Sequence, residues 1–223
     1  MKLLIKFASR SRFDKLMACL KNIRKLAKGD YHILLTLDTD DNSIDHLKLS
    51  EYQNKYGGVT IVYGASKSKV HAINRDINIV SYEWDVLLNM SDDMVFTEPG
   101  FDLQILEEFK DFKGLLHLPD GFANERLVTM AIMHREYYKK FGYIYHPSYI
   151  SLWCDNEQTD VAKLLNEYKY VNKRLFYHDH PNNTGVALDL QYRHTESFYS
   201  IDGSTYHERK QKNFGLPIRS TFN

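Results

Sequence analysis

The chain has 223 residues, of which 29 are Lys or Arg and 29 are Asp or Glu, so its formal net charge is zero. This balance, with 43% hydrophobic residues, excludes a basic nucleic-acid coat protein, an acidic tail protein and a disordered chain. No apolar run approaches the roughly 20 residues of a membrane span, and the opening segment is too charged for a signal peptide, so we expect a cytoplasmic protein. Cys19 and Cys154 are too few for a disulfide framework or a Cys-rich zinc site.

The neutral total hides two segments of opposite charge. Residues 1–30 hold nine basic side chains against two acidic ones, whereas residues 83–111 hold nine acidic side chains against one basic. Local fields of both signs would allow one site to bind a metal ion and a polyanion together. Two solvated helix faces are the structural alternative for most of these charges.

The first 93 residues alternate between strand-like and helix-like segments. Ser11 followed by Asp14 is typical of a capping box at the start of the first helix. The alternation predicts a mainly parallel α/β sheet flanked by helices. Strands are predicted at residues 2–7, 31–37, 59–63 and 84–90, and helical spacing of apolar residues covers 13–23, 44–52 and 70–80.

The later segments are less regular, but no low-complexity linker or internal repeat separates them, so we expect a single domain. Within it we distinguish a nucleotide-binding half (1–93), an acceptor and metal half with a small antiparallel part (94–181) and a C-terminal helical extension (182–223). Helices are predicted at residues 101–112, 136–141 and 155–168, and strands at 115–118, 127–134 and 174–178.

Polar clusters follow the four strands predicted in the first half. Ligands of open α/β sheets bind beyond the carboxyl ends of the strands, so these clusters are the first candidates for a site. They are Ser9 with Arg10, residues 38–41, residues 66–69, and Asp92 with Asp93.

Asp92 and Asp93 follow the apolar run VLLNM and are the sharpest signal. Adjacent carboxylates resist ionisation unless a cation pairs with them, and hard divalent ions take oxygen ligands. A solvated turn or a helix cap is the alternative. The apolar run before the two acids is typical of a buried strand and makes this alternative less favoured.

His178 and His180 would point to the same face of a strand. A set of imidazole and carboxylate ligands suits Mn²⁺, Fe²⁺ or Zn²⁺ better than Mg²⁺ or Ca²⁺. Two ordinary surface or core histidines are the alternative.

Lys69 belongs to a segment that opens a helix after a strand, where backbone N–H groups and lysines favour phosphate. Arg10 after the first strand could also face phosphate. A solvated surface role is equally open for both. Asp155 could cap its helix, or it could accept a proton from an acceptor hydroxyl at the mouth of a site.

Residues 1–181 resemble the GT-A fold glycosyltransferases, in particular the small nucleotide-sugar transferases of family two. The resemblance implies a Rossmann-like GT-A domain that moves a hexosyl or pentosyl group from a nucleotide sugar, typically a UDP sugar, to a hydroxyl with inversion. Ser91 departs from the family pattern, because it stands where the first Asp of the Asp-x-Asp motif is expected. The segments that carry the resemblance, in the order of that family, are FASRSR, LLTLDTDD, ASKSKVHAIN, LLNMSDDM, WCDNEQTD and YHDHP.

The resemblance also implies roles for single residues on the donor side. Asp38 and Asp40 would lie near the base and the ribose of the nucleotide. Arg10 and Lys69 would lie near the nucleotide or the diphosphate. Asp92 would contact the sugar nucleotide.

On the metal and acceptor side, the resemblance implies that Asp93 holds a divalent metal, Mn²⁺ or alternatively Mg²⁺. His178 or His180 would complete the metal shell. Asp155 would be the general base of an inverting reaction.

The partners expected are a nucleotide-sugar donor and a carbohydrate acceptor. A modified nucleic-acid base, a lipid-linked sugar and a protein stay open as acceptors. Two other classes fit the same pattern: a metal-dependent nucleotidyltransferase using Asp92 and Asp93, and a non-catalytic module that binds sugars or nucleotides.

Overall fold

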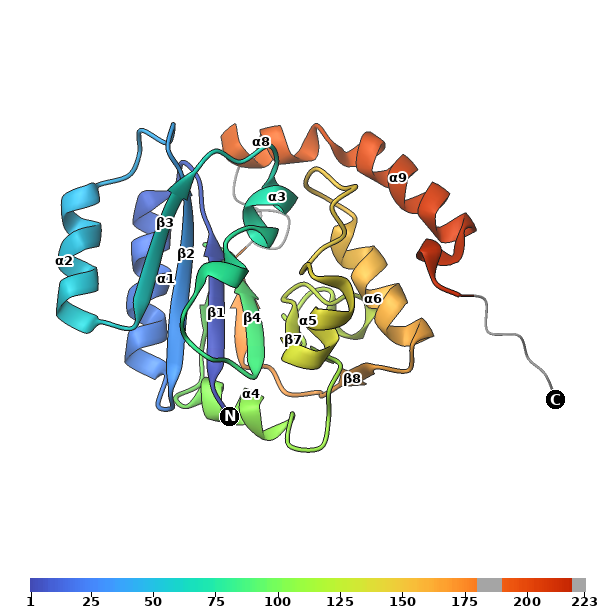
Figure 1. Ribbon diagram of the computed structural model, residues 1–223, viewed down its shortest axis with the longest axis horizontal. Coiled ribbons are helices and arrows are strands. Elements are labelled where there is room, and N and C mark those ends of the chain that lie inside the picture. The colour runs from blue at the N-terminus through green and yellow to red at the C-terminus, as the bar shows by residue number, and fades with distance from the viewer. Residues whose placement is uncertain (180–189, 218–223) are drawn as a thin grey trace.

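The computed structural model describes residues 1–179 and 190–217. Its N-terminal part alternates strands and helices, as the apolar spacing predicts (Figure 1). The elements of this part are β1 (Leu3–Ala8), α1 (Phe13–Leu26), β2 (Tyr31–Asp38), α2 (His46–Tyr56), β3 (Val59–Gly64), α3 (Lys69–Asn74), the 3₁₀ turn η1 (Ile77–Ile79) and β4 (Val86–Met90).

The later part contains shorter strands and the remaining helices. Its elements are β5 (Met94–Phe96), α4 (Phe101–Glu107), β6 (Leu115–His117), η2 (Asn124–Arg126), β7 (Ile132–His134), α5 (Arg135–Phe141), α6 (Cys154–Leu164), β8 (Tyr168–Tyr170), β9 (Phe176–His178), α8 (Leu190–Glu196), α9 (Tyr199–Gln211) and η3 (Asn213–Gly215).

Seven strands form one sheet in the order β3-β2-β1-β4-β7-β6-β8. The four strands β3, β2, β1 and β4 are parallel, whereas β7 runs antiparallel to both β4 and β6, and β6 and β8 are parallel. A second sheet pairs β5 with β9 in antiparallel orientation. The predicted fold class, a mainly parallel sheet flanked by helices with a small antiparallel part, is therefore confirmed.

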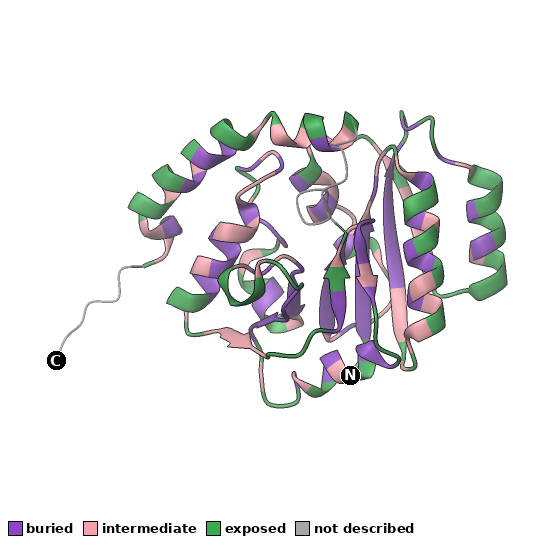
Figure 2. Cartoon of the chain, turned by 180° about the vertical axis from the view of Figure 1, so that it is seen from behind, coloured by how far each residue is buried: buried purple, intermediate pink, exposed green. Residues whose placement is uncertain are grey.

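Alternate residues of the central strands point to two separate cores. Leu3, Ile5 and Phe7 of β1 belong to the core that α1, α2 and α4 cover, whereas Leu4 points to the core under α3, α5, α6 and α9. Strands buried on both faces have apolar residues at nearly every position, which explains the continuous apolar runs in the sequence. Figure 2 shows strands of the sheet buried along most of their length, while the helices expose their outer faces.

The capping box predicted for the first helix is wrong. Helix α1 begins at Phe13 with Arg12 as its N-cap, and no side chain caps it. Ser11 instead has a left-handed φ of 61°, and its backbone N–H donates to Asp41 Oδ2 at 2.8 Å. A tertiary contact between two loops at the sheet edge therefore replaces the local cap.

Two predicted helices end early because a residue adopts a left-handed conformation. The helix predicted at 70–80 ends at Asn74, and Asp76 with φ 76° separates it from η1. The helix predicted at 155–168 ends at Leu164, and Asn166 with φ 56° turns the chain into β8. The strand predicted at 127–134 is confined to Ile132–His134.

The two C-terminal helices lie near the carboxyl end of the parallel strands. In Figure 1, α8 crosses the end of the sheet where β1 stops, and α9 runs along α6. Asp202 of α9 is fully buried, and its carboxylate accepts the backbone N–H groups of Ile150, Ser151 and Leu152. Helix α9 therefore holds the loop before α6 in place.

Within residues 1–179 and 190–217, no helix combines the length and apolar character that crossing a membrane requires.

Candidate active site

The polar clusters that follow the parallel strands meet at one edge of the sheet. All four contribute side chains to a cavity of about 310 Å³ beyond β1, β2, β3 and β4. The charged residues of this cavity, called here the first cavity, are Arg10, Arg12, Asp38, Asp40, Lys67, Lys69, Asp92 and Asp93.

A second cavity, of about 410 Å³, adjoins the first. Lys69 and Asp93 line both cavities, so the two cavities are direct neighbours. The charged or imidazole side chains of the second cavity are Lys69, Asp93, Asp120, Arg126, Asp155 and His178. Every described residue of the predicted site thus lines at least one of the two cavities.

Arg10 joins the two carboxylates predicted near the nucleotide. Its guanidinium donates to Asp38 Oδ2 at 2.8 Å and to both oxygens of Asp40 at 2.6 and 2.8 Å. The hydrogen bonds from Arg10 hold the pKa of Asp40 below its ordinary value. Asp38 is buried, and among the described residues its Oδ1 accepts no hydrogen bond.

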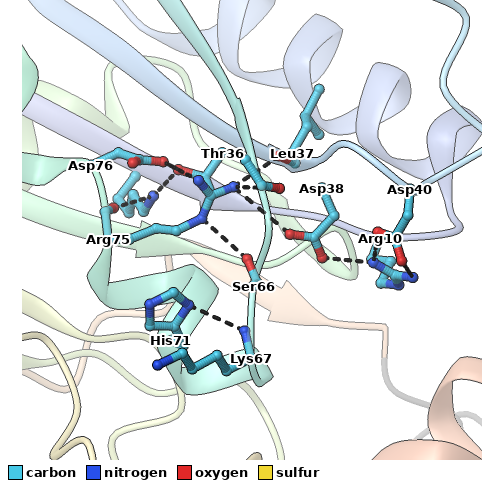
Figure 3. A network of polar contacts seen from close by, with 12 residues as sticks. Arg10, Thr36, Leu37, Asp38, Asp40, Ser66, Lys67, His71, Arg75 and Asp76 are labelled. Atoms are coloured by element: carbon cyan, nitrogen blue, oxygen red, sulfur yellow. Dashed lines mark hydrogen bonds and ion pairs between the residues drawn. The ribbon is translucent and has the colours of Figure 1, made fainter.

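Arg75 lies beside that oxygen of Asp38 (Figure 3). Its Nη2 donates to the carbonyl of Leu37 at 2.8 Å and lies 3.8 Å from Asp38 Oδ1, and its Nε donates to Ser66 Oγ at 3.1 Å. Gly64 makes room for this side chain, because a Cβ there would lie 2.3 Å from Arg75 Nη1. Arg75 thus ties the ends of β2 and β3 together at the first cavity.

Lys6 is a buried lysine next to the same cavity. It is fully buried on β1, where its ammonium donates to Thr36 Oγ1 and, at 3.0 Å, to the carbonyl of Arg75. Thr36 donates in turn to Asp76 Oδ2 at 2.8 Å and lines the first cavity. Burial lowers the pKa of Lys6 to about 7, although Asp76 opposes the shift.

The segment before α3 forms the opposite wall of the first cavity. Ser68 is the N-cap of α3, and its hydroxyl accepts the backbone N–H of His71 at 3.1 Å. The backbone N–H of Lys67 donates to the imidazole of His71, as Figure 3 shows. Lys67 and Lys69 are exposed, so their ammonium groups are accessible to an anion in the cavity.

Asp92 is held between a hydroxyl and a guanidinium. Ser9 donates to its Oδ2 at 2.7 Å, and Arg12 Nη1 donates to its Oδ1 at 3.2 Å. Burial raises the pKa of Asp92, against the opposing effects of Ser9 and Arg12. The guanidinium of Arg12 also lies 3.8 Å from the centre of the Tyr192 ring on α8.

Asp93 and His178 are brought together by the small second sheet. β5 and β9 pair with Met94 opposite His178, and the backbone N–H of Asp179 donates to the carbonyl of Asp93 at 2.7 Å. Asp93 Oδ1 lies 3.3 Å from His178 Nε2. Burial opposes ionisation of Asp93, but His178 and a hydrogen bond from Tyr192 hold its pKa well below the ordinary value.

Asp93 and His178 fit one side of a divalent-metal site. A carboxylate and an imidazole converge there, a set that suits Mn²⁺, and among the described residues the buried Oδ1 of Asp93 accepts no hydrogen bond. His180 lies outside the described residues. Over residues 1–179 and 190–217, no group of three or more His, Cys, Asp or Glu side chains could hold a metal ion. Further ligands would have to come from elsewhere.

Asp155 lies at the second cavity, near the start of α6. The capping alternative for this residue is wrong, because the N-cap of α6 is Trp153, with a left-handed φ of 61°. The Asp155 carboxylate accepts the backbone N–H of Asn156 at 3.0 Å. Burial within the surrounding protein raises its pKa, against the effects of that N–H and of Lys69. A carboxylate with a raised pKa at a cavity is suited to accept a proton.

Several residues of the site were not among the sequence candidates. Lys6 carried a signal, because a charged side chain interrupts the apolar strand LLIKFA. Asp120 stands in a Pro-Asp-Gly sequence that is typical of an ordinary turn. Arg75 and Tyr192 carried no local signal, because only the packing of distant elements brings Arg75 beside Asp38 and Tyr192 to the second cavity.

No protein-family model matches the chain, and no curated protein matches it in sequence. Solved structures do match it. The mannosyltransferase PcManGT from Pyrobaculum calidifontis, in complex with GDP-Man and Mn²⁺, has a TM-score of 0.61 at 10% identity, over 77% of this chain and 54% of that one. TarS 1–349 from S. aureus, in complex with UDP-GlcNAc, has a TM-score of 0.60 at 11% identity, over 84% and 62% of the two chains.

A third solved structure belongs to a different class of enzyme. The 4-diphosphocytidyl-2C-methyl-D-erythritol synthase from Anaerococcus prevotii has a TM-score of 0.50 at 9% identity, over 81% of this chain and 92% of that one. The chain spans less than two thirds of the two glycosyltransferase chains above. At these identities the likeness defines the fold: the chain has the GT-A fold of nucleotide-sugar glycosyltransferases.

Proposed function

We propose that the protein transfers a sugar from a nucleotide-sugar donor to a hydroxyl acceptor. The observation that carries the proposal is the pair of adjoining cavities at the carboxyl edge of a GT-A sheet, which share Lys69 and Asp93. A nucleotide-sugar donor has two parts, a nucleoside diphosphate and a sugar. Two adjoining cavities can hold one part each. The complexes of PcManGT with GDP-Man and Mn²⁺ and of TarS with UDP-GlcNAc support a nucleotide-sugar donor.

The first cavity is the proposed nucleotide site, and a UDP sugar is the proposed donor. Asp38 offers a buried carboxylate oxygen that could accept an N–H of the base. Asp40, which pairs with Arg10, would lie beside the ribose. Arg10 and Lys69 would neutralise the diphosphate. Asp92, anchored by Ser9, would contact the sugar nucleotide.

Asp93 and His178 would hold the divalent metal, Mn²⁺ or alternatively Mg²⁺, with His180 as a second candidate ligand. When bound, the metal would supply positive charge that stabilises the leaving diphosphate. The buried Asp93 is kept ionised by its neighbours, so it can bind a cation without first losing a proton. Lys69, at the junction of the cavities, can contribute further positive charge beside the same diphosphate.

Asp155 is the proposed general base of an inverting reaction. It would take the proton of the acceptor hydroxyl while the acceptor oxygen forms a bond to the anomeric carbon. The bond from that carbon to the diphosphate oxygen breaks, and its electron pair leaves with the nucleoside diphosphate. The raised pKa of Asp155 brings its proton affinity closer to that of the group it must deprotonate.

A carbohydrate is the proposed acceptor, because the second cavity offers both carboxylate and aromatic side chains that suit a polyhydroxyl ligand. A lipid-linked sugar, a protein and a modified nucleic-acid base are the alternative acceptors. A nucleic-acid acceptor would bind with a steep salt dependence, which a carbohydrate would not show.

The test is a donor panel. The protein is incubated with UDP sugars and GDP sugars, with and without Mn²⁺, and release of nucleoside diphosphate is measured. We expect slow hydrolysis of at least one donor in Mn²⁺, and its loss in the variant Asp93→Ala. Failure of every nucleotide to bind, with or without metal, would contradict the proposal.

A nucleotidyltransferase is the second candidate, because the A. prevotii synthase structure is matched over 92% of its length. The same assay separates the two functions by their products. A glycosyltransferase releases a nucleoside diphosphate from a nucleotide sugar, whereas a nucleotidyltransferase releases pyrophosphate from a nucleoside triphosphate.

A further inference from the structure

His178 lies between two buried carboxylates, one at each nitrogen of its ring. Nε2 lies 3.3 Å from Asp93 Oδ1, and Nδ1 lies 3.9 Å from Asp120 Oδ2. The first contact belongs to the proposed metal site. The contact with Asp120 was not expected from the sequence, and the proposed reaction assigns Asp120 no role.

The Asp120 carboxylate is fixed by its own loop. It is 2% exposed and follows the end of β6. Its Oδ1 accepts the backbone N–H groups of Phe122 and Ala123, each at 2.8 Å, and that of Asn124 at 3.4 Å. One oxygen is therefore occupied by the backbone, and the other, Oδ2, is the one that faces His178.

The imidazole is placed independently of Asp120. The pairing of β5 with β9 sets the backbone of His178 beside Met94, and the N–H of Asp179 closes the ladder on Asp93. The strand ladder thus holds the His178 ring, and the turn at Asp120 holds the carboxylate that faces it. A hydrogen bond needs about 3 Å, so a shift of roughly 1 Å would complete it.

We propose that Asp120 is a positioning residue for His178. By accepting the proton of Nδ1, it leaves Nε2 free to give up its own proton and to bind, together with Asp93, a divalent cation between them. Ligand histidines are commonly oriented by a carboxylate in this way, because the partner of one nitrogen decides which nitrogen can bind the metal. This inference rests on the proposed function only for the identity of the cation. The pairing of Asp120 with His178 does not depend on the proposed function.

The variant Asp120→Asn isolates the proposed role. The backbone N–H groups of the turn still need an acceptor, so the amide oxygen takes the place of Oδ1 and the amide NH₂ faces His178. A donor at that position favours the other tautomer, in which Nε2 carries the proton and cannot bind a cation. Asp102→Asn is the matched control, because Asp102 is also buried and accepts backbone N–H groups, from Lys28 and Gly29, away from both cavities.

Two measurements on the full chain test the inference. The first is Mn²⁺ binding, with and without UDP, followed by electron paramagnetic resonance. We expect the dissociation constant for Mn²⁺ to rise roughly tenfold to a hundredfold in Asp120→Asn and to stay unchanged in Asp102→Asn. Wild-type Mn²⁺ affinity in Asp120→Asn would overturn the inference, even if transfer is lost, because Asp120 would then contact a substrate instead.

The second measurement needs no metal, and its readout is the wild-type protein. ¹⁵N chemical shifts of the imidazole nitrogens in the metal-free wild-type protein, assigned with His178→Gln, report which nitrogen carries the proton. A proton on Nδ1, with or without a second proton on Nε2, supports the inference, and a ring whose only proton is on Nε2 overturns it. If the wild-type chain binds neither Mn²⁺ nor UDP, the proposed function fails, while the tautomer still decides the pairing of Asp120 with His178.

Discussion

The hydroxyl of Tyr192 on α8 donates a 2.6 Å hydrogen bond to Oδ2 of Asp93, across 99 residues of sequence. The other oxygen of the same carboxylate faces His178. A side chain of α8 therefore occupies one of the two oxygens that a metal at Asp93 would use. The ring of Tyr192 is itself held by Arg12, whose guanidinium lies 3.8 Å from its centre.

Replacing Tyr192 by Phe should strengthen metal binding. The hydrogen bond stabilises Asp93 in the absence of a cation, so a cation that needs Oδ2 must displace it. We expect the dissociation constant for Mn²⁺ to fall by about threefold to tenfold, in line with a net hydrogen-bond contribution of about 1 kcal/mol. Calorimetric titration with Mn²⁺ measures this, and Tyr56→Phe, on the distant helix α2, is the control. Weaker binding in Tyr192→Phe would mean that Tyr192 supports the metal site.

The variant Asp155→Asn should abolish most of the transfer without affecting donor binding. A general base contributes about 10²- to 10⁴-fold to a rate, so we expect turnover to fall within that range. Binding of UDP and Mn²⁺, measured by calorimetry, should stay as in the wild type. Asp160→Asn, on the same helix but paired with Tyr206 and Lys210, is the matched control. Full activity in Asp155→Asn would remove this residue from the mechanism.

The rate of transfer should rise with pH through the pKa of Asp155. The base acts only when deprotonated, and burial raises its pKa above the value of about 3.9 that is ordinary for Asp. The rate is therefore expected to fall on the acid side at a higher pH than an exposed Asp would give. A profile of kcat/KM against pH at saturating metal checks this. A rate that is level down to the ordinary Asp range would contradict the assignment.

Lys6 should make the stability of the fold depend on pH. Its pKa is about 7 in the folded protein and about 10.4 in an unfolded chain. Between these values the unfolded chain binds a proton that the folded chain does not, so the free energy of unfolding rises with pH. The contribution of Lys6 approaches about 1.4 kcal/mol per pH unit.

Urea unfolding of the wild type and Lys6→Met at pH 7, 8, 9 and 10 measures this contribution. The difference between the two free energies of unfolding should grow in favour of the wild type as the pH rises. Lys48→Met, which removes an exposed lysine, should give no such trend. Parallel curves for the wild type and Lys6→Met would show that Lys6 keeps its proton.

Arg75→Met should weaken nucleotide binding. Arg75 bridges Leu37, Ser66 and the neighbourhood of Asp38, so its loss should loosen the wall of the first cavity. We expect the dissociation constant for UDP to rise by about tenfold, corresponding to about 1.4 kcal/mol. The control is Arg24→Met, because Arg24 also bridges several groups, Tyr31, Tyr52 and Gly57, on the other side of the sheet. Equal losses in both variants would indicate general destabilisation.

The parallel part of the fold could be predicted because its signals are local. Apolar runs buried on both faces and helical spacing alternate over the first 93 residues, and the strands β1 to β4 lie within a residue or two of their predicted positions. The three-residue strands β5 and β8 were not predicted, because β5 follows Asp93 directly and β8 begins where the predicted helix 155–168 ends. The break at Asp76 could not be predicted either, because Thr36 on β2 holds that residue by a tertiary hydrogen bond.

The candidate site divides in the same way. Arg10, Asp38, Asp40, Asp92 and Asp93 could be singled out, because a parallel sheet places whatever follows its strands at one edge. What these residues contact was not predictable. Arg10 pairs with Asp38 at the end of β2 and with Asp40 just after it, and Asp92 pairs with Ser9, because the segments after β1, β2 and β4 approach one another only in the folded chain.

The equal numbers of basic and acidic residues excluded classes of protein, and their segregation along the chain predicted fields of opposite sign. The sequence alone therefore determined the class of the sheet and the edge at which its polar clusters gather, because strand period, helix period and polar strand ends are properties of neighbouring residues. The tertiary structure decided which charges meet. It set His178 between Asp93 and Asp120 and brought Tyr192 onto Asp93, because strand pairing and helix packing join segments that no local pattern connects.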